Sequence, residues 1–409
     1  MSDRPHILVV GGGQAGGQTL RRLLETPTQC QITFVSNERI SPYERPPLSK
    51  GYLKGETTFD QLRIVSDEEL ADPRVTLRLG EELIRIAPSV NEAHFASGLS
   101  LGYDAVILAL GARARPLPVP GAENCIELRD LKDSQKLRER LDGANHITII
   151  GGGVIGLEVA ATARLMGKEV TVLEAGQRVM GRILPGPVAG WLRGMHEERG
   201  VRILTETTIC EIRKNGERFQ ADIRHSSGET ETLNTDIVLS AIGVVPNVEC
   251  LPEEFRGSTG GIRTDATGKV IGLENVYAIG DMAECFNGLY ASHIRLETWR
   301  NADNQAASVA ATVLGTPTEH TETPWMWSDQ YEHNLQVVGL WQDGCDLIQR
   351  GALGTTGSTT FWLKHGVVAG AVMLNSGRER RFIEKMVANR TCSDPTQLAD
   401  TSIALKSMV

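Results

Sequence analysis

The stretch HITIIGGGVIGLE, residues 146–158, decides the fold that this sequence predicts. A short apolar run leads into three glycines, and a segment with a helical pattern follows. A strand that passes through a glycine-rich turn into a helix begins a nucleotide-binding βαβ unit. The chain opens with a second copy of this pattern, HILVVGGGQAGG, residues 6–17. Two copies predict two nucleotide-binding domains in one chain.

The repeat extends beyond the glycine turns. The first copy continues into ITFVS (32–36) and later YDAVILALG (103–111), both of which read as buried strands. The second copy continues into VTVLE (170–174) and DIVLSAIG (236–243) in the same order. Each half is therefore predicted to be a parallel α/β unit with helices on its sheet.

The remainder of the chain predicts the domain boundaries. Residues 37–62 are rich in Pro and Arg and read as irregular, and the proline-rich segment 113–121 reads as a linker. Beyond about residue 318 the pattern changes to strand-like alternation, and a helical tail is expected from about Arg378. The predicted fold is α/β, with two Rossmann-like dinucleotide-binding domains and a smaller α+β C-terminal domain. The predicted domains are a discontinuous first one (1–113 and 246–318), a second one (114–245) and a C-terminal one (319–409).

Composition excludes several classes of protein. The chain has 409 residues, and its longest apolar runs have the length of a strand, so no membrane-spanning helix is expected. The N-terminus does not resemble a signal peptide, which makes a cytoplasmic location the expectation. A net charge of −9 argues against nucleic acid as a partner. Seven scattered cysteines form no Cys-x-x-Cys pair and no metal pattern, so reduced thiols and no metal site are expected.

Each glycine fingerprint predicts a pyrophosphate site. The first glycine permits a tight turn, the second lets the backbone approach the phosphates, and the third lets helix and strand pack closely. The helix N-terminus then offers free N–H groups to the phosphates. One fingerprint alone is equally well explained as a tight turn, but two copies in βαβ context favour two dinucleotide sites. The predicted contacts are Gly11, Gly12, Gly13, Gln14, Ala15 and Gly16 in the first loop, and Gly151, Gly153, Val154, Ile155 and Gly156 in the second.

An acidic residue about 20 positions after a fingerprint ordinarily binds the adenosine ribose. Glu174 occupies that position in the second copy. A carboxylate there repels a 2′-phosphate, so NADH is expected in preference to NADPH, although Arg178 and Arg182 lie close enough in sequence to offset part of that repulsion. In the first copy either Asn37 or Glu38 can bind the ribose, and the sequence leaves both open. A solvated loop charge is the alternative explanation of Glu38.

Taken together, these features resemble the glutathione-reductase-like flavoproteins that bind two dinucleotides. Within that family, the sequence is similar to the ferredoxin reductases of bacterial oxygenase systems, of the putidaredoxin reductase and aromatic-ring dioxygenase reductase type. The resemblance covers nearly the whole chain. It rests on YERPPLSK (43–50), GGGVIGLEVAATA (151–163), YAIGDMAEC (277–285), RLETWRNADNQA (295–306) and PWMWSDQY (324–331).

The resemblance implies FAD in the first domain, NADH in the second, and a small [2Fe-2S] ferredoxin as the electron acceptor. The ferredoxin is expected to feed an aromatic-ring-hydroxylating (Rieske) dioxygenase or a similar oxygenase. The sequence departs from the family pattern at two positions. Leu110 stands where the family usually has Thr, and Asn37 replaces the usual acid. Neither change removes a catalytic group.

The resemblance also assigns roles to single residues. It places Arg45 and Lys50 at the flavin, with Lys50 near N5, and pairs Lys50 with Glu158, the last residue of the opening stretch. Trp327 is expected to approach the flavin ring from the C-terminal domain, and these groups are expected to tune and position rather than to act as acid or base. The alternative explanation of Lys50, taken alone, is a solvated loop lysine. The alternative explanation of Arg129 is a surface arginine. The other implied FAD contacts are Ala109, Gly111, Arg129, Gly280, Asp281, Glu297, Thr298 and Trp299, and the other implied NADH contacts are Glu158 and Gly243.

The cysteine positions bear on how electrons leave. No cysteine lies between Cys30 and Cys125, whereas disulfide- and peroxide-reducing relatives carry one or two near the flavin. The flavin is therefore expected to be the only redox centre, and it suits a switch from two-electron to one-electron transfer. Arg295, Arg300 and the segment 377–385 are candidate docking groups for an acidic ferredoxin, although the segment also reads as a solvated helix face. Two alternatives remain: an NADH oxidase or quinone-type reductase, and a redox-sensing flavoprotein resembling the apoptosis-inducing factor family.

Overall fold

The computed structural model describes residues 4–27 and 29–409. Its chain divides into two compact units. The first unit comprises residues 1–46, 58–113 and 244–322, and the second comprises 47–57, 114–243 and 323–409. The predicted second and C-terminal domains thus belong to one unit, together with the short segment 47–57 that the sequence had assigned to the first domain.

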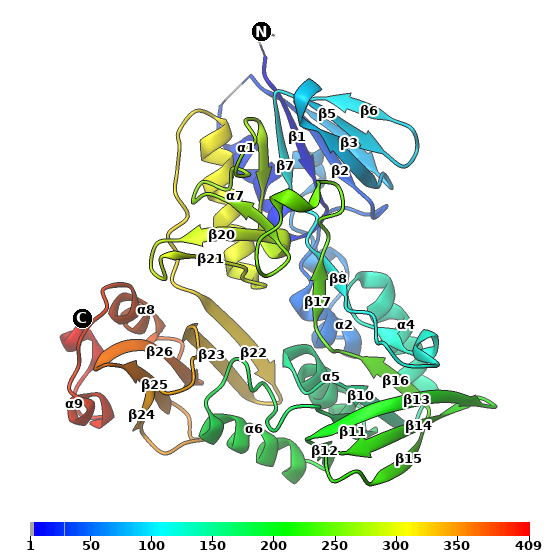
Figure 1. The fold of residues 1–409 in the computed structure, drawn as a ribbon, viewed down its shortest axis with the longest axis vertical. Coiled ribbons are helices and arrows are strands. Elements are labelled where there is room, and N and C mark those ends of the chain that lie inside the picture. Colours follow the sequence, from blue (N-terminus) through cyan, green and yellow to red (C-terminus); the bar gives the residue numbers. More distant parts are fainter. Residues whose placement is uncertain (1–3, 28) are drawn as a thin grey trace. The chain divides into compact units, whose positions relative to one another are not determined.

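The first unit is built on a parallel sheet with strand order β19-β7-β1-β2-β3. The apolar strands of this sheet are almost wholly buried, because helices α1 and α7 cover them, and Figure 1 shows these two helices side by side. This arrangement confirms the predicted α/β class for the first half of the chain. The elements are β1 (His6–Val10), α1 (Gln14–Glu25), β2 (Gln31–Ser36), α3 (Asp67–Leu70), β3 (Val75–Leu79), β7 (Ala105–Leu108), β19 (Val276–Ala278) and α7 (Trp299–Val313).

Two small sheets complete the first unit. One is antiparallel and lies between β3 and β7 in sequence, and the other mixes a parallel with an antiparallel pair. Neither sheet was predicted from the sequence, because most of these strands are short and carry a weak alternating pattern. The strands are β4 (Leu83–Ala87), β5 (Glu92–Phe95) and β6 (Ser100–Gly102) in one, and β18 (Ile262–Thr264), β20 (Ala283–Asn287) and β21 (Ser292–Ile294) in the other.

The chain leaves the first unit and returns to it through two short strands that pair with each other, β8 (Ala112–Ala114) and β17 (Val244–Pro246). The second unit contains the other parallel sheet, with strand order β12-β11-β10-β16-β9. The opening stretch of the sequence forms β10 and the start of α5, as predicted. The elements are β9 (Ile126–Glu127), α4 (Leu131–Gly143), β10 (His146–Ile150), α5 (Val154–Leu165), β11 (Glu169–Leu173), α6 (Gly186–Glu198), β12 (Val201–Leu204) and β16 (Ile237–Ser240).

An antiparallel sheet of three strands follows β12 and lies beside the parallel sheet (Figure 1). It buries Ile209, Ile212 and Phe219 in a core shared with Leu173 of β11. The strands are β13 (Thr207–Asn215), β14 (Arg218–His225) and β15 (Thr230–Thr235).

The C-terminal part of the second unit is an antiparallel sheet with order β22-β23-β26-β25-β24, followed by two helices. Its inner residues, including Trp362, share one hydrophobic core with α5 and α6. This confirms the predicted α+β character, although β25 is buried along nearly its whole length rather than alternating. The elements are β22 (Trp325–Gln330), β23 (His333–Gly339), β24 (Asp346–Arg350), β25 (Thr359–Lys364), β26 (Val367–Leu374), α8 (Arg380–Ala388) and α9 (Pro395–Ala399).

Residues 37–62 are more ordered than the sequence predicted. They contain 3-10 turns at Pro46–Ser49 and Asp60–Leu62 and the short helix α2 (Gly51–Lys54). Three hydrogen bonds tie the middle of this region to the second unit: Ser134 Oγ donates to Leu48 O, Thr162 Oγ1 to Ser49 O, and Gln135 Nε2 to Tyr52 Oη. The prediction of an irregular segment was wrong because tertiary bonds, which the sequence pattern does not show, hold these turns.

Candidate functional site

The first glycine loop has the geometry that a pyrophosphate site requires. Gly11 has φ +132°, and a Cβ at Gly16 would lie 1.9 Å from the carbonyl oxygen of Gly11. The first and third glycines are thus required by backbone conformation and by close helix–strand packing. At Gly13, by contrast, the nearest atom to a Cβ would be Arg45 Nε at 3.8 Å. The second glycine therefore borders open space at the N-terminus of α1, where an anion is favoured.

The second loop repeats this geometry in the other unit. Gly151 has φ +108°, and a Cβ at Gly156 would lie 2.0 Å from the carbonyl oxygen of Gly151. A Cβ at Gly153 would meet nothing within 4 Å. Ile155, in the first turn of α5, is exposed. Both loops therefore leave a free surface at the second glycine, and the three glycines serve different physical needs, as the sequence predicted.

Glu174 lies directly after β11 and is bound to backbone amides. Its Oε2 accepts from Gly152 N at 2.8 Å, and its Oε1 accepts from Gly176 N at 2.7 Å. The carboxylate therefore orders the glycine loop, and it keeps lone pairs for further donors. Arg182 reaches Gly243, because its Nη2 lies 3.9 Å from the position of a Cβ there. Arg178 instead extends toward Asp343, 4.0 Å away.

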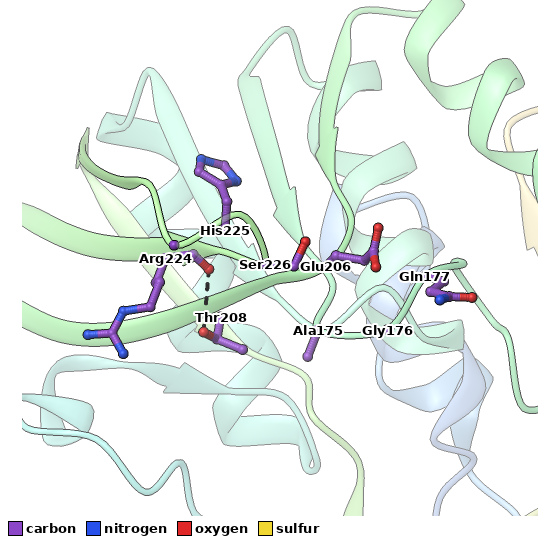
Figure 2. A pocket seen from close by; sticks show the side chains of 9 residues that line it. Ala175, Gly176, Gln177, Glu206, Thr208, Arg224, His225 and Ser226 are labelled. Carbon is purple, nitrogen blue, oxygen red and sulfur yellow. Dashed lines mark hydrogen bonds between the residues drawn. The ribbon is translucent and has the colours of Figure 1, made fainter.

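A pocket of about 440 Å³ opens beside the residues that follow Glu174, and Figure 2 shows its lining. The loop after β11 forms one wall, and the β13–β14 hairpin forms another. The walls are joined by backbone bonds from Glu206 N to Gly176 O and from Ser226 N to Glu206 O, both 2.9 Å. Arg224 and His225 give the hairpin wall a basic character. The lining residues are Ala175, Gly176, Gln177, Glu206, Thr208, Arg224, His225, Ser226 and Gly228.

In the first unit, Glu38 is the centre of a small polar cluster. Its Oε1 accepts from Arg45 Nη2 at 2.9 Å, and its Oε2 accepts from Tyr43 Oη at 2.6 Å. The Arg45 guanidinium also lies 5.5 Å from the centroid of the Tyr43 ring. Asn37 is exposed. The structure thus brings Glu38 and Arg45 together, while the choice between Asn37 and Glu38 as the ribose ligand stays a prediction.

Several predicted contacts gather where 3-10 turn η6 (Gly280–Met282) meets the start of α7. Gly280 has φ +73°, and its N–H donates to Gln305 Oε1 at 2.7 Å, which binds the turn to the helix. Thr298 caps α7 by accepting from Asn301 N. Glu297 forms an ion pair with Arg295, whose guanidinium also donates to the carbonyl of Asp281.

Glu44 lies near Trp299, the first residue of α7. Burial and the nearby charge of Asp303 raise the pKa of Glu44, and a hydrogen bond from Trp299 counteracts part of this. The loop that carries Arg45 is therefore linked to the segment of Trp299 within the first unit. The other two predicted contacts, Ala109 and Gly111, lie just after β7, where Ala109 N donates to Val10 O and Gly111 has φ +63°.

Lys50 and Glu158 form a buried ion pair within the second unit. Lys50 Nζ lies 2.7 Å from Glu158 Oε2, and the Glu158 side chain is 2% exposed. Ser49 Oγ donates to the same oxygen at 2.5 Å, while Ser328 Oγ donates to Oε1 at 2.7 Å. The pairing that the resemblance implied is therefore present. Ser49 and Ser328 were missed, although Ser328 directly follows Trp327, and the alternation of a strand could have indicated that these two side chains point to opposite faces.

Trp327 lies on β22 next to Ser328, on the opposite face of the strand. Its ring stacks on Trp325 with centroids 5.2 Å apart, and its Nε1 donates to Asp329 Oδ2 at 3.1 Å. Arg380 of α8 covers Trp325, with its guanidinium 4.6 Å from the ring centroid. Arg129 also belongs to the second unit and precedes α4, where its N–H donates to Asp133 Oδ2. The predicted flavin contacts are thus divided between the two units.

Both glycine loops fit the pyrophosphate of a dinucleotide. Both amide atoms of Gln14, at the start of α1, are buried without a hydrogen-bond partner, which is costly unless a ligand satisfies them. Gly13 and Gly153 border open space at the two helix N-termini. Residues Gly11–Gly16 and Gly151–Gly156 therefore match the needs of two dinucleotides, one in each unit.

The described residues contain neither a candidate metal-binding cluster nor a candidate membrane-spanning helix. Residues 4–27 and 29–409 contain no group of three or more His, Cys, Asp and Glu side chains placed to hold a metal ion. In the same residues, every helix is too short or too polar to cross a bilayer. All seven cysteines are free thiols. Burial raises the pKa of Cys125 and of Cys250 to about 12, so neither is a reactive thiolate.

Two glycine loops on two parallel sheets define a protein that binds two dinucleotides. The chain belongs to the pyridine nucleotide-disulphide oxidoreductase family, whose pattern it matches over residues 5–306, and it carries a reductase C-terminal domain over 325–409. The fold that the sequence predicted is confirmed by these matches.

Similar proteins share the full length of the chain. It is 34% identical to the ferredoxin–NAD⁺ reductase component of the anthranilate 1,2-dioxygenase system of Burkholderia cepacia, with all of both chains covered. The solved ferredoxin reductase for the CYP199A2 system of Rhodopseudomonas palustris is 32% identical, with a TM-score of 0.92 and 99% of both chains covered. Putidaredoxin reductase in its covalent complex with putidaredoxin is 31% identical, with a TM-score of 0.91 over 99% of this chain and 98% of that one.

Proposed function

We infer that this protein is an FAD-dependent NADH:ferredoxin oxidoreductase that supplies an oxygenase system. The observation that carries the inference is the presence of two complete glycine loops in a chain that matches oxygenase-system ferredoxin reductases from end to end. FAD is assigned to the first unit and NADH to the second. The named relatives are reductases of an anthranilate dioxygenase system and of the CYP199A2 system, or form a complex with putidaredoxin, and they support a small ferredoxin as the acceptor.

The bound flavin supplies the chemistry, since it takes a hydride from NADH and releases electrons one at a time. The chain contributes positioning and charge. Lys50 pairs with Glu158, which is itself held by Ser49 and Ser328, and the Lys50 ammonium group is proposed to stabilise negative charge as the flavin is reduced. Trp327 is proposed to pack on the flavin ring. No side-chain acid or base is assigned to hydride transfer.

Glu174 is proposed to bind the adenosine ribose of NADH. Its carboxylate is fixed by Gly152 and Gly176, and the pocket of Figure 2 begins at the next residue. That pocket is of a size to receive an adenosine group. Arg182 and Gly243, which lie together, are proposed to border the rest of the nucleotide, and Glu174 is expected to disfavour NADPH.

The acceptor is proposed to be a [2Fe-2S] ferredoxin, and the oxygenase to be an aromatic-ring-hydroxylating dioxygenase or a similar enzyme. Two of the predicted docking groups are paired with acidic side chains: Arg295 pairs with Glu297, and Arg300 pairs with Glu322. These pairs reduce the positive charge that either arginine can offer to a partner. On α8, Arg380 lies 3.7 Å from Glu384, and Arg381 lies over Phe382. Arg381 is therefore the preferred residue for a test of docking.

A cytoplasmic location is proposed as well. NADH is an intracellular donor, and seven cysteines without a disulfide are the state that a reducing compartment maintains.

The test is reduction of cytochrome c by NADH with the FAD-loaded protein, with and without a [2Fe-2S] ferredoxin from a dioxygenase system. Strong dependence on ferredoxin is the expected result. Arg381→Glu should raise the KM for ferredoxin severalfold and weaken its salt dependence, because docking of opposite charges is screened by salt. Arg140→Glu, on the exposed face of α4, is the control. Rapid oxygen consumption without ferredoxin would instead support an NADH oxidase, and slow turnover with a long-lived charge-transfer complex would support a redox sensor.

A further inference from the structure

A chain of buried polar side chains continues from Glu158 into the C-terminal part of the second unit. Ser328 Oγ donates to Glu158 Oε1 at 2.7 Å, and Gln330 Nε2 donates to Ser328 Oγ at 3.0 Å. His196 Nε2 then lies 2.7 Å from Gln330 Oε1. Three elements contribute: α5 carries Glu158, β22 carries Ser328 and Gln330, and α6 carries His196. Each of these side chains is at most 2% exposed.

The charge of Glu158 determines the direction of every bond in this chain. An ionised carboxylate only accepts hydrogen bonds, so the Ser328 hydroxyl must donate to it. That hydroxyl therefore accepts from the Gln330 amide, which turns the amide oxygen toward His196. His196 must then carry its proton on Nε2. Three dipoles in line point toward the carboxylate, and aligned hydrogen bonds strengthen one another.

The groups around His196 favour this direction of hydrogen bonding, in which Nε2 of the ring carries the proton. Burial lowers the pKa of His196 to about 4, so the ring is neutral near pH 7 and has a single N–H. Tyr331 Oη lies 3.5 Å from Nδ1, on the side of the ring that has no proton. Burial raises the pKa of Tyr331 to about 12, so its hydroxyl stays a donor. Arg199 lies over the Tyr331 ring and also helps to lower the pKa of His196.

We propose that Ser328, oriented by Gln330 and His196, is a positioning residue that keeps Glu158 ionised and thereby holds Lys50 in place for flavin reduction. This inference rests on the proposed function. Ser328 provides the donor to Oε1, whereas Ser49 and Lys50 both bind Oε2. Loss of the Ser328 hydroxyl would leave a buried anionic oxygen without that donor, and such an oxygen takes up a proton more readily.

The ionisable groups around Glu158 define the pH readout. Lys50 contacts it from the turn before α2, and His196 reaches it from α6 through two side chains. Arg199 and Tyr331 border the imidazole. On β22, Asp329 points to the other face with Trp327. Protonation of Glu158 would release Lys50, so the acid limb of the flavin-reduction rate reports the state of this pair.

The experiment measures flavin reduction by NADH in stopped flow, with the FAD-loaded protein, from pH 5.5 to 8.5. Ser328→Ala is expected to lower the limiting rate at pH 7 about tenfold, the equivalent of one charge-assisted hydrogen bond, with the Kd for NADH unchanged. Its acid limb should move to higher pH. Ser328→Thr keeps the hydroxyl and should restore most of the rate. Gln330→Met breaks only the outer link and should slow reduction about threefold.

Thr360→Val is the matched control, because Thr360 is a buried hydroxyl on β25 that donates to Gln349 and is not part of the chain to Glu158. It should lower thermal stability without changing the rate or its pH profile. A wild-type rate and acid limb in Ser328→Ala would overturn the inference, as would the same acid-limb shift in Thr360→Val. If Ser328→Ala does not fold, a wild-type profile in Gln330→Met overturns it. If NADH does not reduce the flavin of the wild-type protein, the proposed function itself is refuted. Failure of the inference about Ser328 and failure of the proposed function therefore give different results.

Discussion

Glu158 receives hydrogen bonds from three neighbours, Lys50, Ser49 and Ser328, while only 2% of its side chain is exposed. An unpaired carboxylate could not remain ionised at such a site, so each donor offsets part of the desolvation cost. The ion pair is therefore a device for fixing the position of a charge. The pair is expected to contribute little to the free energy of unfolding, since burying two charges costs about as much as their attraction returns.

Removal of the charge at Lys50 is the direct test of its proposed role. Lys50→Ala should slow flavin reduction by NADH about 100-fold, the lower end of the range seen when a group that stabilises developing charge is lost. The Kd for NADH should change less than twofold, because NADH is assigned to other residues. Stopped-flow reduction at several NADH concentrations separates the two quantities.

Lys54→Ala is the matched control for this prediction. Lys54 also lies in the 47–57 segment, but it pairs with Glu56, which is largely exposed. An equal loss of rate in both variants would assign the effect to the segment rather than to Lys50.

At Glu174, the expected outcome concerns nucleotide preference. Glu174→Gln keeps an acceptor for one backbone N–H but removes the negative charge that opposes a 2′-phosphate. The kcat/KM for NADH should fall about tenfold, and that for NADPH should rise. Glu169→Gln, at the exposed start of the same strand, should leave both values unchanged. An unaltered NADH-to-NADPH ratio in Glu174→Gln would exclude this residue as the determinant.

At the scale of elements, α1 and α5 each start from a glycine loop and lie in different units. Each glycine loop joins one strand to one helix within a single unit, so each dinucleotide site depends on its own strand–loop–helix segment. The third glycine of each loop is the most sensitive position, because its Cα packs against the carbonyl of the first glycine.

This separation predicts two different defects. Gly156→Ala should retain FAD, with a normal flavin spectrum, but lose most reduction by NADH. Gly16→Ala should instead lose FAD, because a methyl group there would overlap the Gly11 carbonyl. Gly190→Ala, on the exposed face of α6 with nothing within 4 Å of the added carbon, should keep both functions and be more stable by about 0.5–1 kcal/mol. Absorbance of the purified protein and anaerobic titration with NADH measure the two sites. Loss of FAD in Gly156→Ala would contradict the assignment.

At the scale of the whole molecule, each unit contains one buried histidine. His196 belongs to the second unit and His320 to the first, and burial lowers the pKa of each to about 4. His320 Nε2 lies 3.0 Å from Asn301 Oδ1, and the backbone N–H of His320 donates to Ala266 O. Both rings are therefore neutral in the folded protein at pH 7.

The two histidines predict how stability depends on pH. Between pH 6.5 and 4 the unfolded chain binds more protons than the folded one, so stability is full above about pH 6.5 and falls as the pH decreases. Each histidine should remove about 3 kcal/mol by pH 4. Denaturant unfolding of the FAD-loaded protein between pH 4 and 7.5 measures this loss. His320→Gln should show a smaller loss than the wild type, whereas His225→Gln, at a partly exposed ring, should not. Equal slopes in the wild type and His320→Gln would contradict the prediction.

Two features followed from local sequence patterns: the two dinucleotide-binding folds and the positions of their glycine loops. A glycine that needs φ above zero, such as Gly11 or Gly151, and an apolar strand before it are local requirements, and local requirements are visible in a sequence. The alternation of apolar and polar residues beyond about residue 318 likewise predicted the C-terminal sheet. The pairing of Lys50 with Glu158 was available only through the family resemblance, because the two residues are 108 positions apart.

The groups that complete the site could be identified only from the packed fold. Residues 47–57 pack with the second unit, because hydrogen bonds to α4 and α5 hold them there. Ser328, Gln330 and His196 join Glu158 across distances of up to 170 residues in the chain. Serine and glutamine carry no periodic signal, and their contribution depends on burial and on the direction of a neighbour's hydrogen bond. Both are properties of the packed molecule, whereas the glycine loops follow from the allowed conformations of a few consecutive residues.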